Sequence, residues 1–111
     1  MTALLLRPDK LWTSDGGLQA GQVLVEGNRI AAAGRFEAPA HAHVVELGGL
    51  TLMPGLMDLH SHLFLHPYNE TVWDDQVLKE SEAYRTVRAV RHAAATLNAG
   101  FTLLRDLGTE G

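Results

Sequence analysis

Short apolar runs separated by turn-forming residues follow one another along the first part of the chain and predict β-strands. The first run extends from Thr2 to Leu6, and Asp15-Gly16-Gly17 marks a turn after it. Two further runs, Gln22 to Glu26 and Arg29 to Ala33, flank Gly27-Asn28. This dipeptide suits the positive φ angles of a two-residue turn, so the pattern predicts a β-hairpin.

A second pairing is predicted for His43 to Leu47 and Leu50 to Met53, which flank Gly48-Gly49. Residues 1–53 would then form a small antiparallel β-module. Its apolar content is limited, so we expect it to need further strands from elsewhere.

Beyond Pro54 the pattern changes to a strand, a helix and a second strand. Leu56 to Leu63 is predicted as a buried strand, Glu82 to Asn98 as a helix, and Phe101 to Leu107 as another buried strand. This order predicts a βαβ unit with parallel strands and a right-handed crossover. The predicted fold class is therefore α/β.

The ends of this helix are marked by residues that commonly cap helices. Ser81 or Glu80 lies at its start, and Gly100 lies just past its end, where a left-handed residue is common. Its apolar residues recur at steps of three and four, which predicts one narrow apolar stripe. The stripe consists of Ala83, Val87, Val90, Ala94 and Leu97.

The loop from Phe64 to Lys79 is much longer than the about 2–6 residues usual for such a connection. Loops after the carboxyl ends of parallel strands lie on the active-site face of α/β folds, so His66 and Tyr68 are candidates for substrate contacts. The alternative is an ordinary excursion with a helical turn around Thr71 to Val77, in which Trp73 merely packs. The sequence leaves both readings open.

Composition restricts the class of protein. The 111 residues are 46% hydrophobic and 20% charged, which is typical of soluble globular proteins. A net charge of −4 argues against nucleic-acid or anionic-membrane partners. Without cysteine the metal donors are His, Asp and Glu, and no run approaches the roughly 20 apolar residues of a membrane helix. No targeting segment is visible, so we expect a cytoplasmic protein.

The stretch Pro54 to His62 carries the most specific chemistry, an Asp-x-His-x-His run directly after a Pro-Gly turn. Side chains alternate along a strand, so Asp58, His60 and His62 share one face and Leu59 packs on the other. Two imidazoles on one face can bind a divalent transition metal, and a nearby acid can fix an imidazole tautomer. The alternative is a hydrogen-bonded histidine pair without metal.

His41 and His43 have the same spacing but a different context. They follow Glu37-Ala38-Pro39-Ala40, which is typical of a loop, and no acid lies beside them in phase. We interpret them as solvated loop histidines.

The segment from Pro54 to His62 resembles the amidohydrolase superfamily, whose members begin with a small β-module and a Pro-Gly-x-x-Asp-x-His-x-His strand. The resemblance covers essentially the whole chain, with Val23 to Gly34 similar to the module's hairpin and Gly100 to Gly108 similar to barrel strand two. Leu65-His66-Pro67-Tyr68 and Leu104 to Gly108 are similar to the imidazolonepropionase-like and prolidase-like branch.

The resemblance implies a (β/α)8 TIM barrel, of which residues 54–111 would supply strand 1, a long loop, helix 1 and strand 2. Residues 1–53 would form part of a composite β-sandwich. A barrel needs about 250 residues, so we expect the chain to be an N-terminal fragment with an incomplete barrel and active site.

The resemblance also implies that His60 and His62 bind a divalent metal, most simply one or two zinc ions, with Asp58 in a supporting role. Metal-activated water would then hydrolyse a carbon–nitrogen bond in an amide, cyclic amide or dipeptide-like small molecule. The proton-transfer Asp is expected outside this chain. Asp106 could approach the site, or else pair with Arg105 or cap a helix.

Three alternatives remain at this point. A deaminase of an amino-substituted heterocycle uses the same scaffold. A non-catalytic fragment would act only with a complementing chain. A stand-alone metal-binding module would need oligomerisation to complete its ligands, and a homo-oligomer is left open.

Overall fold

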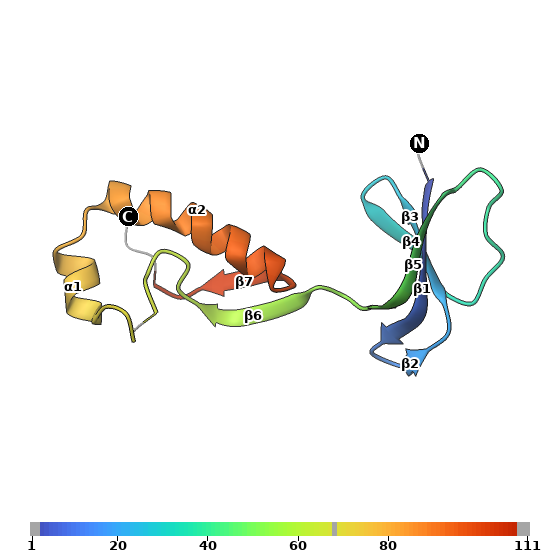
Figure 1. Cartoon of the computed structure of the whole chain (residues 1–111), viewed down its shortest axis with the longest axis horizontal. Helices are drawn as coiled ribbons and strands as arrows, with labels where there is room; N and C mark the ends of the chain where they lie inside the picture. The colour runs from blue at the N-terminus through green and yellow to red at the C-terminus, as the bar shows by residue number, and fades with distance from the viewer. Residues whose placement is uncertain (1–2, 68, 109–111) are drawn as a thin grey trace. The chain divides into compact units, whose positions relative to one another are not determined.

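The computed structural model describes residues 3–67 and 69–108. The chain divides after Pro54 into two compact units, residues 1–54 and residues 55–111. The first unit consists of β-strands, and the second combines two strands with two helices (Figure 1).

The first unit is a five-stranded sheet with the order β2-β1-β3-β4, in which β5 pairs with β1. The first strand is long enough to pair with β2 near its end and with β3 near its start. The strands are β1 (Ala3–Thr13), β2 (Gly17–Gln19), β3 (Gln22–Glu26), β4 (Arg29–Gly34) and β5 (His43–Leu52).

The predicted hairpin is present between β3 and β4. The two strands are antiparallel, and Glu26 lies opposite Arg29 across the turn. Gly27 has a φ of 61°, whereas Asn28 does not have a positive φ. One glycine therefore supplies the left-handed conformation that the turn requires.

The predicted pairing across Gly48-Gly49 is wrong. Residues 43–52 form one strand, β5, which pairs in parallel with β1. The register shifts between Pro8 and Lys10, and Gly49, with a φ of 78°, lies in the stretch of β5 opposite this shift. The glycines accommodate an irregularity in the strand instead of a turn, so the module's sheet is mixed rather than antiparallel.

The core of the first unit is small, as the limited apolar content predicted. Leu5 is fully buried and packs with Ala3 and Leu24. Several large apolar side chains of the same unit are exposed, among them Ile30 at 70%. Partly buried side chains around the core are Ala32, Phe36, Ala38, Ala42 and Val44.

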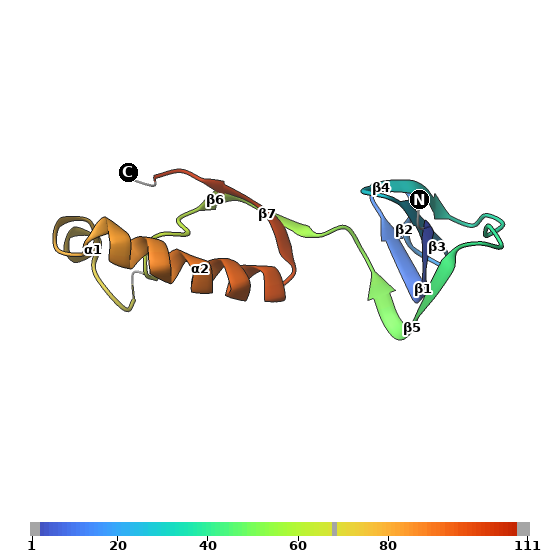
Figure 2. The ribbon, with the colours of Figure 1, turned by 90° about the horizontal axis from the view of Figure 1, so that it is seen from above.

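The second unit contains the predicted strand–helix–strand order. Strands β6 and β7 pair in parallel, and α2 lies along β7 (Figure 1 and Figure 2). Both strands end earlier than predicted, at Ser61 and Asp106. The prediction that they are buried is wrong for the described residues, because Met57 is 64% and Leu103 48% exposed in a pair of strands that one helix covers only in part. The elements are β6 (Leu56–Ser61), α1 (Trp73–Leu78), α2 (Glu82–Asn98) and β7 (Phe101–Asp106).

The predicted bounds of α2 are confirmed. The hydroxyl of Ser81 accepts a hydrogen bond from the Tyr84 N–H at 3.3 Å, as an N-cap does. At the other end Gly100 has a φ of 93° and donates its N–H to the Leu97 carbonyl at 2.9 Å. The left-handed glycine ends the helix.

The predicted apolar stripe of α2 does not face the rest of its unit. Val87 and Val90 are 70% and 69% exposed, whereas Arg85, Arg88 and Ala89 are buried. Periodicity identifies a stripe but not what covers it. The inward face of α2 instead supplies hydrogen-bond donors to the irregular backbone after β6.

Gly55 lies where β7 closes over the start of β6. Leu56 pairs with Phe101, and a Cβ on Gly55 would overlap the Thr102 side chain, including its Cβ at 2.7 Å. The Pro-Gly turn therefore meets a packing requirement between the two strands.

We expect Gly55→Ala to lower the free energy of unfolding by about 1–3 kcal/mol, because the added methyl group overpacks the contact with Thr102. Chemical denaturation followed by circular dichroism measures the change. The matched control is Gly108→Ala, whose Cβ would meet the His62 ring at an ordinary 3.4 Å. Equal destabilisation by the two substitutions would contradict the packing explanation.

Candidate functional site

His60 and His62 lie together at the carboxyl end of β6. Their ring centroids are 5.4 Å apart, with ring planes at 71°. His60 is the penultimate residue of the strand, and His62 directly follows its last residue. The parallel partner β7 holds this strand end in place, so the two imidazoles are neighbours on one short segment.

His62 carries a nitrogen that suits a metal ligand. Its Nδ1 is buried and has no hydrogen-bond partner within residues 3–67 and 69–108. Buried polar atoms without partners are uncommon, and an imidazole nitrogen is a favoured donor to divalent transition metals. The donor type and the open nitrogen therefore fit a metal that this pair of histidines would hold.

Asp58 uses its carboxylate locally. Its Oδ1 accepts a hydrogen bond from the backbone N–H of His60 at 3.0 Å. This contact holds the backbone of the histidine rather than its ring. On the opposite face Leu59 is 61% exposed, so the packing expected for it is absent from the part of the chain described.

The described residues contain no cluster of three or more His, Cys, Asp or Glu side chains that could hold a metal ion. A catalytic zinc normally takes three protein ligands plus water. Within residues 3–67 and 69–108, His60 and His62 would therefore supply two of these three ligands at most.

Asp106 joins the ends of the two parallel strands. Its Oδ2 accepts the Leu63 N–H at 2.9 Å, and its Oδ1 accepts the Gly108 N–H at 3.0 Å. The structure shows this carboxylate bound to the backbone amide next to His62, so Asp106 does approach the site. An acid at the end of a predicted strand was the sequence signal for this position.

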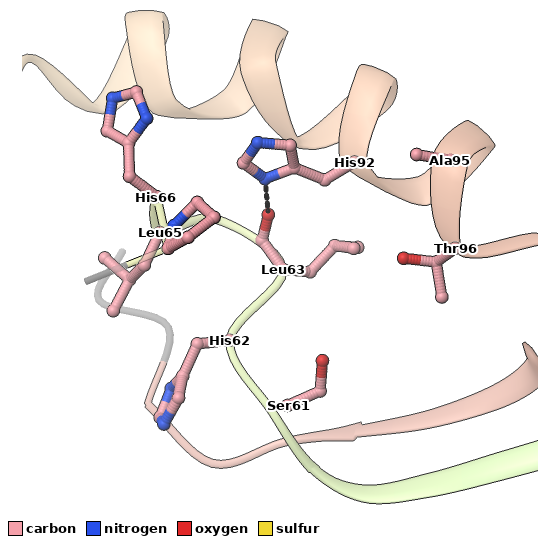
Figure 3. Close-up of a pocket in the computed structure, with 9 residues that line it drawn as sticks. Ser61, His62, Leu63, Leu65, His66, His92, Ala95 and Thr96 are labelled. Atoms are coloured by element: carbon pink, nitrogen blue, oxygen red, sulfur yellow. Dashed lines mark hydrogen bonds between the residues drawn. The ribbon is translucent and has the colours of Figure 1, made fainter. Parts of the chain in front are cut away.

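A cavity of about 380 Å³ lies between the backbone after β6 and α2 (Figure 3). His92 points towards it from α2, and its Nδ1 bonds the Leu63 carbonyl at 2.8 Å. Polar residues that line the cavity are Ser61, His62, His66, His92 and Thr96.

His66, a predicted substrate-loop residue, belongs to a polar cluster at this cavity. Its Nε2 lies 3.0 Å from Glu80 Oε1 and also contacts Arg88 Nη1. The same Nη1 donates to Glu80 Oε2 at 2.7 Å. The other predicted loop residue, Tyr68, lies outside the described residues.

Gln76 of α1 anchors the loop and was missed in the sequence. Its side chain is fully buried, accepts the His66 N–H at Oε1, and donates from Nε2 to the carbonyls of His66 and Thr71. The predicted helical turn is present as α1, but Trp73 is 49% exposed and does not simply pack. A polar residue on the inward face of a short helix gives little signal in a single sequence.

The environment of Glu80 favours its ionised form. Burial raises the pKa of this carboxyl, but the adjacent Arg88 guanidinium and His66 lower it by more. The pKa therefore lies below its ordinary value of 4.5. The carboxylate is thus available to hold Arg88 in the cluster.

The histidines set apart as solvated are both exposed. His41 lies in a turn, whereas His43 is the first residue of β5 and not part of a loop. Neither imidazole has a hydrogen bond or ion pair within the part of the chain that the structure describes.

Solved structures of similar fold cover almost the whole chain. An amidohydrolase is 32% identical with a TM-score of 0.80, over 99% of this chain and 26% of its own. The resemblance to the amidohydrolase superfamily is confirmed. A prolidase complexed with N-methylphosphonate-L-proline is 26% identical with a TM-score of 0.78, over 96% of this chain and 26% of its own. Its name agrees with the prolidase-like branch predicted above.

Two curated relatives match shorter stretches. The 5'-deoxyadenosine deaminase of Methanothermobacter thermautotrophicus is 45% identical over 49 residues, 43% of this chain and 12% of the relative. The dihydroorotase of Halalkalibacterium halodurans is 36% identical over 59 residues, 53% of this chain and 14% of the relative. These amidohydrolase relatives are enzymes that act on carbon–nitrogen bonds.

The chain thus spans about a quarter of the solved structures and 12–14% of the curated relatives that it matches. No family model matches it. None of the helices described has both the length and the apolar character needed to cross a membrane.

Glu80→Gln should flatten the pH dependence of stability in acid. Because the pKa of Glu80 is lowered in the folded chain, its contribution is full above about pH 4.5 and is lost as the pH falls through the folded-state pKa. Urea denaturation at a series of pH values below 4.5 should show a steeper loss for the wild type than for the variant. The control is Glu82→Gln, at an exposed position two residues further on, at the start of α2, which should follow the wild type. Superimposable profiles for Glu80→Gln and the wild type would refute the role of the cluster.

Proposed function

We propose that this chain supplies the first two metal ligands, His60 and His62, of an amidohydrolase-type enzyme that hydrolyses a carbon–nitrogen bond. The observation that carries the proposal is the pair of adjacent imidazoles at the carboxyl end of β6, with the buried His62 Nδ1 lacking a partner among the described residues. Because the chain spans only part of its relatives, the activity is proposed for the protein that carries it.

The position of the pair supports a catalytic site. In parallel α/β folds the functional residues gather at the carboxyl ends of the strands, and both histidines lie at that end of β6. Solved structures of similar fold include an amidohydrolase and a prolidase. An alternative use of the two imidazoles as a hydrogen-bonded pair leaves the His62 Nδ1 without a role.

The residues of this chain would bind and orient. His60 and His62 would hold a divalent ion, with zinc as the first choice for imidazole donors. When bound, the ion supplies Lewis acidity that activates water and polarises a carbonyl. Asp58 fixes the backbone of His60, and Asp106 fixes the amide after His62. Nothing in this chain is assigned the proton transfer, which we place outside it.

The proposed substrate is a small amide, cyclic amide or dipeptide-like molecule. Support comes from the names of proteins with similar folds, a prolidase complexed with a phosphonate analogue of proline and a Xaa-Pro dipeptidase with bound methionine. The dihydroorotase adds a cyclic amide to this range. His66 lines the same cavity as His62, and among the described loop residues it is the one that we propose contacts the substrate.

A deaminase is the second candidate, and one observation favours it. The 5'-deoxyadenosine deaminase has the highest identity of the curated relatives compared, 45% over 49 residues. The same two histidines would hold the ion in a deaminase, where it would supply the Lewis acidity that such a reaction needs to activate water.

Removing either histidine should abolish metal binding by this pair. We expect His60→Ala and His62→Ala to lower the affinity for Zn²⁺ at least about tenfold, because each removes one imidazole donor. Isothermal titration calorimetry measures the affinity, and circular dichroism checks folding. His41→Ala, at an exposed histidine in the other unit, should bind Zn²⁺ like the wild type. Equal affinity in all three variants would contradict the ligand assignment.

The two reactions are separated by their products. The protein that carries this chain should release an amino acid from Xaa-Pro dipeptides or open a cyclic amide, without releasing ammonia from aminopurine nucleosides. His62→Ala should remove the activity, and His41→Ala should retain it. Ammonia release that depends on His62, without amide hydrolysis, would favour the deaminase.

A further inference from the structure

We infer that Arg88 and His92 of α2 are positioning residues that set the direction of the His62 ring by fixing the backbone after it. The inference rests on the proposed function, in which His62 is a metal ligand. It extends that function to two residues outside the Asp-x-His-x-His segment.

The backbone from His62 to His66 belongs to neither a strand nor a helix. Its N–H and C=O groups have left the sheet, and such groups are rarely left without partners when buried. Here side chains supply the hydrogen-bond partners that a neighbouring strand would otherwise supply. Asp106 of β7 binds the Leu63 N–H, and Gln76 of α1 binds both backbone groups of His66.

His92 holds the carbonyl of Leu63, the residue after His62. Its Nδ1 lies 2.8 Å from the Leu63 oxygen (Figure 3), and a carbonyl can only accept, so Nδ1 carries the proton. The peptide group one residue after His62 is therefore held from α2 at its oxygen. Asp106 holds the preceding N–H of the same residue from β7.

Arg88 holds the next carbonyl. Its Nη2 donates to the Phe64 oxygen at 2.8 Å, while its Nη1 donates to Glu80 at 2.7 Å. The guanidinium also lies 5.2 Å from the centre of the Tyr84 ring. These contacts hold the planar guanidinium in one orientation. A lysine ammonium group is not planar and cannot make the same set of hydrogen bonds.

The two side chains act from one helix face. Arg88 and His92 are four residues apart on α2, so they lie one above the other on its inward side. They bind consecutive carbonyls, of Leu63 and Phe64, which fixes the path of the chain as it leaves His62. The His62 ring in turn packs beside Gly108, where its Cε1 would lie 3.4 Å from an added Cβ.

The test compares paired variants that remove or preserve each donor. His92→Leu removes the donor, whereas His92→Asn places an amide nitrogen where Nδ1 lies. Arg88→Met removes the guanidinium with all of its contacts, and Arg88→Lys keeps the charge but not the planar guanidinium. The matched control is Arg91→Met, which removes an exposed arginine from the same helix.

The first readout needs no metal. In the wild type the His62 Hε1 proton should give a nuclear Overhauser effect to the Gly108 Hα protons. We expect this signal to be lost in His92→Leu, Arg88→Met and Arg88→Lys, and retained in His92→Asn and Arg91→Met. If Arg88→Lys and His92→Leu both fold and both keep this nuclear Overhauser effect, the inference is overturned. If circular dichroism shows that His92→Leu does not fold, the inference is overturned when Arg88→Lys keeps the effect or when His92→Asn loses it.

The second readout is Zn²⁺ affinity by calorimetry. The donor-removing variants should bind about tenfold more weakly than the wild type, and His92→Asn and Arg91→Met should bind equally well. Wild-type protein that binds no Zn²⁺ would refute the proposed function, while the metal-free signal would still decide the positioning role. Unchanged affinity in the donor-removing variants, with binding lost in His62→Ala, would refute the positioning role alone.

Discussion

Backbone groups that leave a sheet must find new partners, and this requirement governs the candidate site. Strand β6 ends at Ser61, yet the chain stays against its neighbours through His66. It does so because Asp106, His92, Arg88 and Gln76 supply the donors and acceptors that a further strand would otherwise provide. The position of His62 is therefore decided by residues that are distant in sequence.

The same requirement explains the character of α2. A helix that covers a short parallel pair would ordinarily turn its apolar side inward, but here Arg88 and His92 face the irregular backbone. Arginine is tolerated in that position because Glu80, with its lowered pKa, stays ionised beside it. Val87 and Val90 are left at the surface of this unit.

Local signals in the sequence predicted the elements well. The hairpin at Gly27, the exact bounds of α2 and the parallel pairing of β6 with β7 follow from turn residues, caps and periodicity. Gly49 failed as a turn signal because a left-handed glycine also suits a strand irregularity, and single sequences do not distinguish the two. At the site the adjacency of His60 and His62 followed from strand alternation. The contacts that Arg88 and Gln76 make with the backbone of Phe64, His66 and Thr71 could not be foreseen, because main-chain groups have no sequence signature.

Gln76 anchors the start of the long loop through hydrogen bonds to the backbone of His66. Its amide offers the His66 peptide groups one acceptor and one donor, the same pair that the edge of a neighbouring strand would offer. A single side chain thus takes the place of a neighbouring strand. The position of the His66 backbone is set by this one residue rather than by a series of backbone hydrogen bonds between strands. Because α1 supplies these partners, the chain keeps its geometry at His66, close to His62, without another strand beside it.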